Sequence, residues 1–182
     1  MIPIVIFLGI WLAISDASWF RWTNNALSDL GIEGLSAFFF NNGVIFGGIL
    51  VLIFSIGLTQ IIKNKIGAYV LAISSLALIG AGIFPKTVYM LHYVSSVIFF
   101  VCITLALFVI GYSLKKEGTE QSLGIIAIIL AVISCSSIFF QNFLNGIAIP
   151  EAIVCFPAFI WFMIFGLKIT INHKSDNPIL QN

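Results

Sequence analysis

The sequence predicts an all-α, polytopic membrane protein in which six transmembrane helices form one bundle and a short polar lid joins the first two. The first observation is composition: 60% of the 182 residues are hydrophobic and 8% are charged, whereas soluble domains carry roughly 25% charged residues. The second is the length of the apolar stretches, which approach the roughly 20 residues that a helix needs to cross a bilayer. The third is an uneven distribution of lysine and arginine among the connections.

Six apolar stretches alternate with short polar connections. We expect spanning helices at residues 2–20, 38–62, 66–84, 88–114, 122–140 and 150–171. Residues 1–172 then form the transmembrane domain, and residues 173–182 form a short polar tail in the cytoplasm. Ser15-Asp16-Ala17 resembles a signal-peptide cleavage site, but no Lys or Arg precedes the first apolar stretch and an Asp occupies the site. We therefore expect a retained helix.

Orientation follows from the cations. With six spans both termini lie on one side, and that side collects Lys63, Lys65, Lys115, Lys116, Lys168 and Lys174. The other side has Arg21 and Lys86. Because Lys and Arg near span ends are retained in the cytoplasm, we expect a cell-membrane protein with cytoplasmic termini and an outward-facing first connection.

That first connection contains the stretch NNALSDLGIEG, residues 24–34. Asn24 or Asn25 can cap a short helix whose first turn carries Ser28 and Asp29, and Gly31 can end it in the left-handed conformation. We expect this segment to form a lid over the outer mouth of the bundle. The alternative is an ordinary surface loop with one capped turn.

Polar residues also occupy the outer ends of the predicted spans, so we expect them to converge around one pocket. Asp29, His92 and Glu151 are the candidates for proton transfer, because carboxylates and imidazole are the usual general acids and bases. The candidate substrate-binding residues are Arg21, Asn24, Asn25, Ser28, Asn41, Asn42, Lys86 and Asn142. No metal site is expected, because a lone histidine near the membrane forms no ligand cluster.

Each of these candidates also has a structural interpretation. His92 can simply make a hydrogen bond, and Asp16 can pair with Arg21 five residues later. Glu151 follows Pro150, a common pairing at the first turn of a helix. Lys86 is either a cation that extends its stem to the interface or an anchor for a lipid phosphate.

Cysteines and glycines predict packing. Cys102, Cys135 and Cys155 fall inside apolar stretches without metal or CxxC spacing, so we expect small buried residues. Gly43, Gly47 and Gly48 predict close helix packing. Ser95 lies one turn from His92, but no orienting acid accompanies them.

An ordered set of motifs carries a resemblance over roughly residues 1 to 170. The motifs are Ser28-x-Leu30-Gly31, Phe40-Asn41 followed by Gly43, Gly47 and Gly48, and Gly82-x-Phe84-Pro85 followed by His92. Together they resemble the membrane protein family of unknown function number 998 and, more distantly, six-span proteins of the FRAG/DRAM/Sfk type. The resemblance implies six helices and brings no established activity, although some FRAG/DRAM/Sfk proteins are associated with lipid remodelling or trafficking.

Three classes of function remain open. A lipid or amphiphile site at the outer leaflet, binding or modifying its ligand, explains why acid, base and cation gather there. A small-solute or proton-coupled transporter should continue its polar residues to the midplane. In a structural or partner-binding protein, the outer polar residues should bind one another and leave no cavity.

The net charge of +1 gives no basic field for nucleic acid. The sequence identifies neither a cofactor nor an oligomeric state.

Overall fold

The computed structural model describes the backbone of residues 1–118, 120–140 and 143–175. Within these ranges the chain is all-α: it has six α-helices, one short 3₁₀ helix and no strand. The elements in chain order are α1 (Ile2–Asp16), η1 (Leu27–Gly31), α2 (Gly34–Leu58), α3 (Ile66–Ile83), α4 (Tyr89–Glu117), α5 (Gln121–Phe140) and α6 (Ala148–Ser175).

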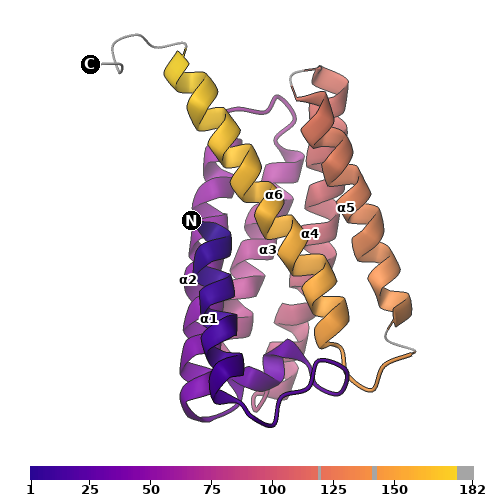
Figure 1. Cartoon of the computed structure of the whole chain (residues 1–182). Coiled ribbons are helices and arrows are strands. Elements are labelled where there is room, and N and C mark those ends of the chain that lie inside the picture. The colour runs from indigo at the N-terminus through magenta and orange to yellow at the C-terminus, as the bar shows by residue number, and fades with distance from the viewer. Residues whose placement is uncertain (119, 141–142, 176–182) are drawn as a thin grey trace.

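Successive helices run in opposite directions, so the connections gather at two ends of the bundle (Figure 1). One end, which we call the lid end, holds η1, residues 84–88 and residues 143–147. The other, which we call the lysine end, holds residues 59–65 and the α4–α5 connection, with Lys63, Lys65, Lys115 and Lys116. There Lys168 pairs with Glu120, with 2.5 Å between Nζ and Oε2.

Among the described residues, four helices are long and apolar enough to cross a membrane: α2, α3, α4 and the Ala148–Ile171 part of α6. The apolar helix α1 and the Gln121–Ser137 part of α5 are shorter. The predicted first span is too long, because α1 ends at Asp16, whose Oδ2 accepts the Ser36 backbone N–H at 3.0 Å. That carboxylate therefore satisfies an N–H in the first turn of α2, which begins four residues before the predicted residue 38.

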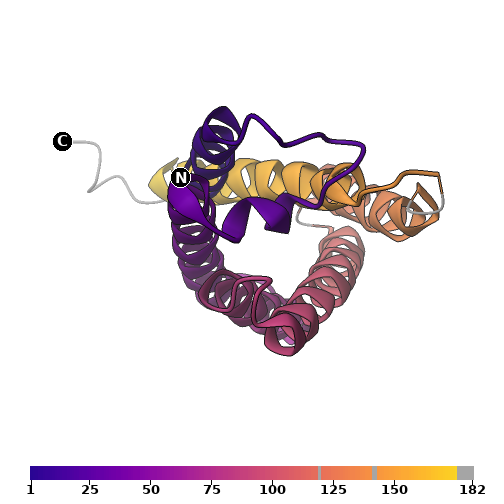
Figure 2. The ribbon, with the colours of Figure 1, turned by 90° about the horizontal axis from the view of Figure 1, so that it is seen from below.

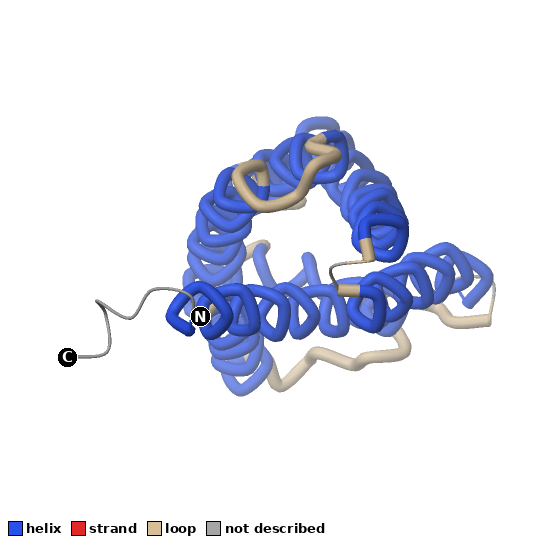
Figure 3. The backbone as a smooth tube through the Cα atoms, turned by 90° about the horizontal axis from the view of Figure 1, so that it is seen from above, coloured by secondary structure: helices blue, strands red, loops and turns tan. Residues whose placement is uncertain are grey.

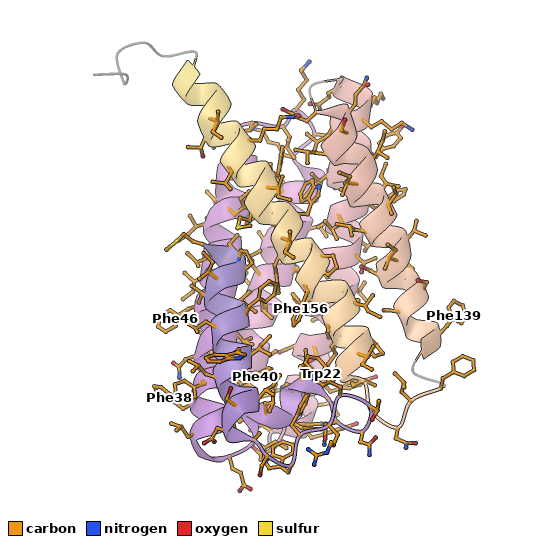
Figure 4. All side chains as sticks on the ribbon, viewed as in Figure 1. Trp22, Phe38, Phe40, Phe46, Phe139 and Phe156 are labelled. Carbon is orange, nitrogen blue, oxygen red and sulfur yellow. The ribbon has the colours of Figure 1, made fainter. Side chains whose placement is uncertain are left out.

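The outer surface of the helices is apolar. Phe38, Phe46 and Phe139 point away from the bundle, with 61%, 56% and 70% of their surfaces exposed (Figure 4). Phe40, on the same helix as Phe38, is buried. Soluble proteins rarely expose apolar surface on this scale. The apolar helices therefore indicate a protein embedded in a membrane.

Seen along the bundle, α2, α3, α4 and α6 are arranged around a common centre (Figures 2 and 3). α1 packs against α2 and α6, and α5 packs against α4 and α6. The fully buried aromatic residues come from α6, and Trp161 among them donates its indole N–H to the Leu123 carbonyl at 3.0 Å. α6 thus contacts both the first and the fifth helix and contributes large buried side chains to the core.

Glycine allows α1 and α2 to approach closely. A Cβ on Gly9 would lie 2.8 Å from Gly43 Cα, and a Cβ on Gly43 would lie 3.0 Å from Gly9 Cα. A Cβ on Gly47 would overlap the side chain of Ile6. The prediction that Gly43 and Gly47 mediate helix packing is confirmed.

The prediction for the cysteines is correct only in part. Cys155 is buried, Cys102 is half-buried and Cys135 is exposed. Cys135 lines a cavity, and α5 diverges from α6 toward the lid end (Figure 1).

Candidate functional site

The lid is a short 3₁₀ helix held at its start by Asp29. Asp29 Oδ2 accepts the Ala26 backbone N–H at 2.8 Å, and Asp29 Oδ1 lies 2.5 Å from Lys86 Nζ. Ala26 is the N-cap residue, so the prediction that Asn24 or Asn25 caps this helix is wrong. The carboxylate can take over this role because it reaches back three residues to the backbone.

The other end of the lid is fixed to α2. Asn41 Nδ2 donates to the Gly31 carbonyl at 3.0 Å, and a Cβ on Gly31 would lie 2.5 Å from Asn41 Oδ1. Gly31 is therefore needed for close approach and does not adopt the predicted left-handed conformation. That conformation belongs to Gly34, with φ of 73°, at the first position of α2.

α6 contacts the N-terminal side of the lid. Glu151 Oε2 accepts the Leu27 backbone N–H at 2.6 Å, and the Ala148 N–H donates to the Asn25 carbonyl at 2.9 Å. The helix begins at Ala148, two residues before Pro150, so Pro150 is not its first residue as predicted. Glu151 still lies in the first turn, but its carboxylate binds the lid rather than its own helix.

Backbone contacts also join the connection before the lid to the one before α6. The Gly146 N–H donates to the Thr23 carbonyl at 2.8 Å. A Cβ on Gly146 would lie 2.3 Å from both Asn24 C and Asn25 N. No side chain fits at this position without moving the backbone, so glycine permits the contact.

Several predicted binding residues make only local contacts. Arg21 Nη1 donates to the Ser18 and Phe20 carbonyls, both at 2.9 Å, and the Arg21 N–H donates to Asn25 Oδ1 at 2.8 Å. Asp16 binds α2 instead of Arg21, so the ion pair considered from the sequence is not formed. The Thr23 hydroxyl donates to Asn24 Oδ1, Asn42 Nδ2 donates to the Phe38 carbonyl, and Asn142 lies outside the described residues.

His92 is buried and its ring has a defined tautomer. Nδ1 lies 2.9 Å from the Phe84 carbonyl oxygen. Because that oxygen can only accept a hydrogen bond, Nδ1 carries the proton and Nε2 is left as an acceptor. Nε2 lies 3.3 Å from the Ser96 hydroxyl. The serine that contacts His92 is therefore Ser96, four residues later on the same helix, and not Ser95.

The electrostatics of the lid keep Asp29 ionised. Burial raises the pKa of Asp29, but hydrogen bonds from Lys86, the Ala26 backbone and Asn25, together with the charge of Lys86, outweigh burial. The pKa of Asp29 therefore lies below its ordinary value. Both carboxylate oxygens are engaged, so Asp29 serves the structure of the lid.

A cavity of about 590 Å³ lies under the lid between α4, α5 and α6. Four of the sequence-predicted residues line it: Ser28, Lys86, His92 and Glu151. A smaller cavity of about 70 Å³ lies on the side of α1 and α2. It shares five lining residues with the larger one, namely Ser28, His92, Ser96, Phe100 and Glu151. Four of these five shared residues are polar, so the wall between the two cavities is largely polar.

The rest of the larger cavity was not predicted from the sequence. Two rows of α4 side chains line it, one from His92 through Ser96 and Phe100 to Thr104, and one from Tyr89 to Leu105. Repetition at every fourth residue was the available signal, since such residues share one helix face. Asp29, Arg21 and the asparagines Asn24, Asn25, Asn41 and Asn42 do not line either cavity.

The cavity wall presents a limited set of chemical groups. Within the described ranges, no cluster of three or more His, Cys, Asp or Glu side chains is arranged to hold a metal ion. His92 Nε2 has the geometry of a proton acceptor toward the Ser96 hydroxyl. The charged groups at the cavity are the Lys86 ammonium and the Glu151 carboxyl group.

Comparison with known proteins returned one family. The model of the family described as "Protein of unknown function (DUF998)" matches residues 1–168. No curated protein and no solved structure matched the chain.

Proposed function

This chain belongs to the DUF998 family, and we propose that it is a six-span membrane protein that binds a lipid or another amphiphile in the cavity beneath its lid. In this proposal both termini are cytoplasmic and the lid end faces outward. The two shorter apolar helices, α1 and α5, cross the membrane beside the four longer ones. The lysines of the lysine end support this orientation, because cations near span ends are retained in the cytoplasm.

The observation that carries the proposal is the amphiphilic character of the larger cavity. Its volume of about 590 Å³ falls within the roughly 300 to 1,000 Å³ of ligand sites. Lys86, Ser28 and Glu151 line the part under the lid, and Val97 and Val101 line the part along α4. A molecule with one polar and one apolar end matches this distribution.

The same cavity weighs against a purely structural role, which predicts a polar cluster satisfied within itself and no cavity. A transport role predicts free polar groups toward the midplane. Thr104 and Ser134 line the deep part of the cavity, but their hydroxyls donate to the Phe100 and Leu130 carbonyls at 2.9 and 2.8 Å. Hydroxyls bound to their own helix provide no polar path.

Lipid retention tests the proposal. We would purify the full chain in mild detergent and measure bound amphiphiles by native mass spectrometry with lipid extraction. The wild-type protein should retain a lipid or another amphiphile, and Val101→Trp, which places an indole in the cavity, should lose most of it. Val132→Trp is the matched control, because Val132 is exposed on α5 and does not line the cavity.

The two variants separate specific binding from adherence to the apolar surface. Loss in Val101→Trp with retention in Val132→Trp supports the cavity as the site. Equal retention by both variants, or no adduct on the wild-type protein, would overturn the proposal.

A further inference from the structure

The larger cavity has one basic and one acidic side chain in its wall, Lys86 and Glu151. Lys86 Nζ is bound to Asp29 on the lid side, but an ammonium has three protons, and Lys86 lines the cavity whereas Asp29 does not. The Lys86 side chain is 36% exposed. The Lys86 side chain therefore lines the cavity, whereas the carboxylate that binds its ammonium does not.

Glu151 has no cationic partner among the described residues. The ion pairs found there are Lys86 with Asp29 and Lys168 with Glu120. Glu151 Oε2 binds a backbone N–H, which is a neutral donor, and Glu151 lines both cavities. A carboxylate so placed is stabilised by any cation that enters the cavity.

Lys86 and Glu151 are not within ion-pair distance of each other, since no salt bridge joins them. A ligand with one cationic and one anionic group can therefore meet both. A purely anionic head would bring its charge toward the Glu151 carboxylate, and a purely cationic head would meet the Lys86 ammonium. Like charges brought together at a binding site repel each other and weaken binding.

The apolar part of the cavity fits the other half of such a ligand. Tyr93, Val97, Val101 and Leu105 form a row on α4 that lines the cavity and is 54%, 43%, 52% and 50% exposed. At about 1.5 Å of rise per residue, the row from Tyr93 to Leu105 extends about 18 Å along the helix. An acyl chain can lie along it with its head under the lid.

We propose that the cavity binds a zwitterionic phospholipid, with its ammonium group at Glu151, its phosphate at Lys86 and an acyl chain along α4. This rests on the proposed function and names the ligand class for the same site. The ammonium can be a primary amine, which donates N–H groups to Glu151, or a quaternary amine, which can also contact the rings of Tyr89 and Tyr93 at the cavity.

Competition among lipids tests this inference. The full chain is stripped of endogenous lipid and incubated with equal amounts of phosphatidylethanolamine, phosphatidylcholine and phosphatidylglycerol of identical acyl chains, and adducts are counted by native mass spectrometry. We expect at least one of the two zwitterionic lipids to bind about tenfold better than phosphatidylglycerol. In Glu151→Gln this preference should fall to about twofold or less.

Glu151→Gln is suited to the test because the glutamine oxygen can still accept the Leu27 N–H. Glu33→Gln is the matched control: Glu33 precedes α2, makes no side-chain cap hydrogen bond and does not line the cavity. It should keep the preference of the wild-type protein.

The outcomes separate the two proposals. The zwitterion inference is overturned if phosphatidylglycerol binds as well as both zwitterionic lipids. It is also overturned if Glu151→Gln keeps the lipid preference of the wild-type protein. In either case the proposal that the cavity binds an amphiphile still stands. Failure of the wild-type protein to bind any of the three lipids, with no endogenous amphiphile retained at purification, overturns the proposed function and the inference with it.

Discussion

The Lys86 ammonium lies 2.5 Å from the Asp29 carboxylate and thereby fastens the α3–α4 connection to the lid. These residues are 57 positions apart, so the pair is a tertiary contact. Asp29 also holds the Ala26 N–H. One carboxylate thus sets the shape of the lid and its attachment to the bundle.

Asp29→Asn should lower the stability of the protein by about 1 kcal/mol, because the asparagine can still accept the Ala26 N–H but loses the charged partner of Lys86. Thermal unfolding in detergent, followed by the reactivity of the buried Cys155, measures this. Glu33→Gln is the control, because it removes a carboxylate that takes no part in these contacts. It should unfold at the same temperature as the wild-type protein. Equal loss in both variants would show that the Asp29 pair contributes nothing specific.

The contribution of Asp29 should depend on pH in one direction. Its pKa is lowered in the folded protein, so the stabilisation is present above the ordinary Asp pKa of about 4. It is lost as the pH falls through the folded pKa. The stability difference between wild type and Asp29→Asn should therefore persist from neutral pH to about pH 4 and diminish below it. A difference that grows under acid would contradict the lowered pKa.

Gly146→Ala should destabilise the lid end by about 1 to 3 kcal/mol, since an added Cβ would displace the backbone of residues 24 and 25. Gly57→Ala is the matched control, because a Cβ there meets no atom within 4 Å. In the helix α2 that substitution should be neutral or stabilising by up to about 1 kcal/mol. Thermal unfolding of both variants measures the contrast, and equal effects would refute the close contact.

His92 should carry a proton on Nδ1, because the Phe84 carbonyl requires a donor. The ¹⁵N spectrum of histidine-labelled protein distinguishes a protonated from an unprotonated ring nitrogen. The chain has two histidines, so His173→Gln assigns the signals. An Nδ1 without a proton would mean that His92 does not donate to the Phe84 carbonyl.

The sequence was sufficient to predict where the polar groups gather, because cation placement and helix length are properties of the chain itself. Contacts such as Asn41 with Gly31 and Glu151 with Leu27 join the ends of different elements, although Asn41 lines neither cavity. Their partners were not predictable. In both cases one partner is a backbone group, and backbone groups have no sequence signature.

The cavity was beyond sequence reasoning for a different reason. The stretch from Tyr89 to Leu105 reads as an ordinary lipid-facing helix, and only the position of α5 relative to α6 turns one face of it into a cavity wall. The predicted capping of the lid failed because Asp29 accepts the Ala26 N–H. The side-chain oxygens of Asn25 and Asn24 accept the Arg21 N–H and the Thr23 hydroxyl instead. The predicted first span, residues 2–20, extended past the end of α1 at Asp16, because hydropathy does not reveal that Asp16 accepts the Ser36 N–H of α2.

Crosslinking with a phospholipid that carries a photoactivatable diazirine on its acyl chain would locate the bound lipid directly. After irradiation in reconstituted membranes, peptide mapping should place most crosslinks on the α4 row from Tyr93 to Leu105 and on Val154 of α6, which line the same cavity. Val101→Trp should remove them. Crosslinks spread equally over outward-facing residues such as Phe38 and Phe46, and unchanged in that variant, would show that lipid only surrounds the bundle and that the cavity does not bind it.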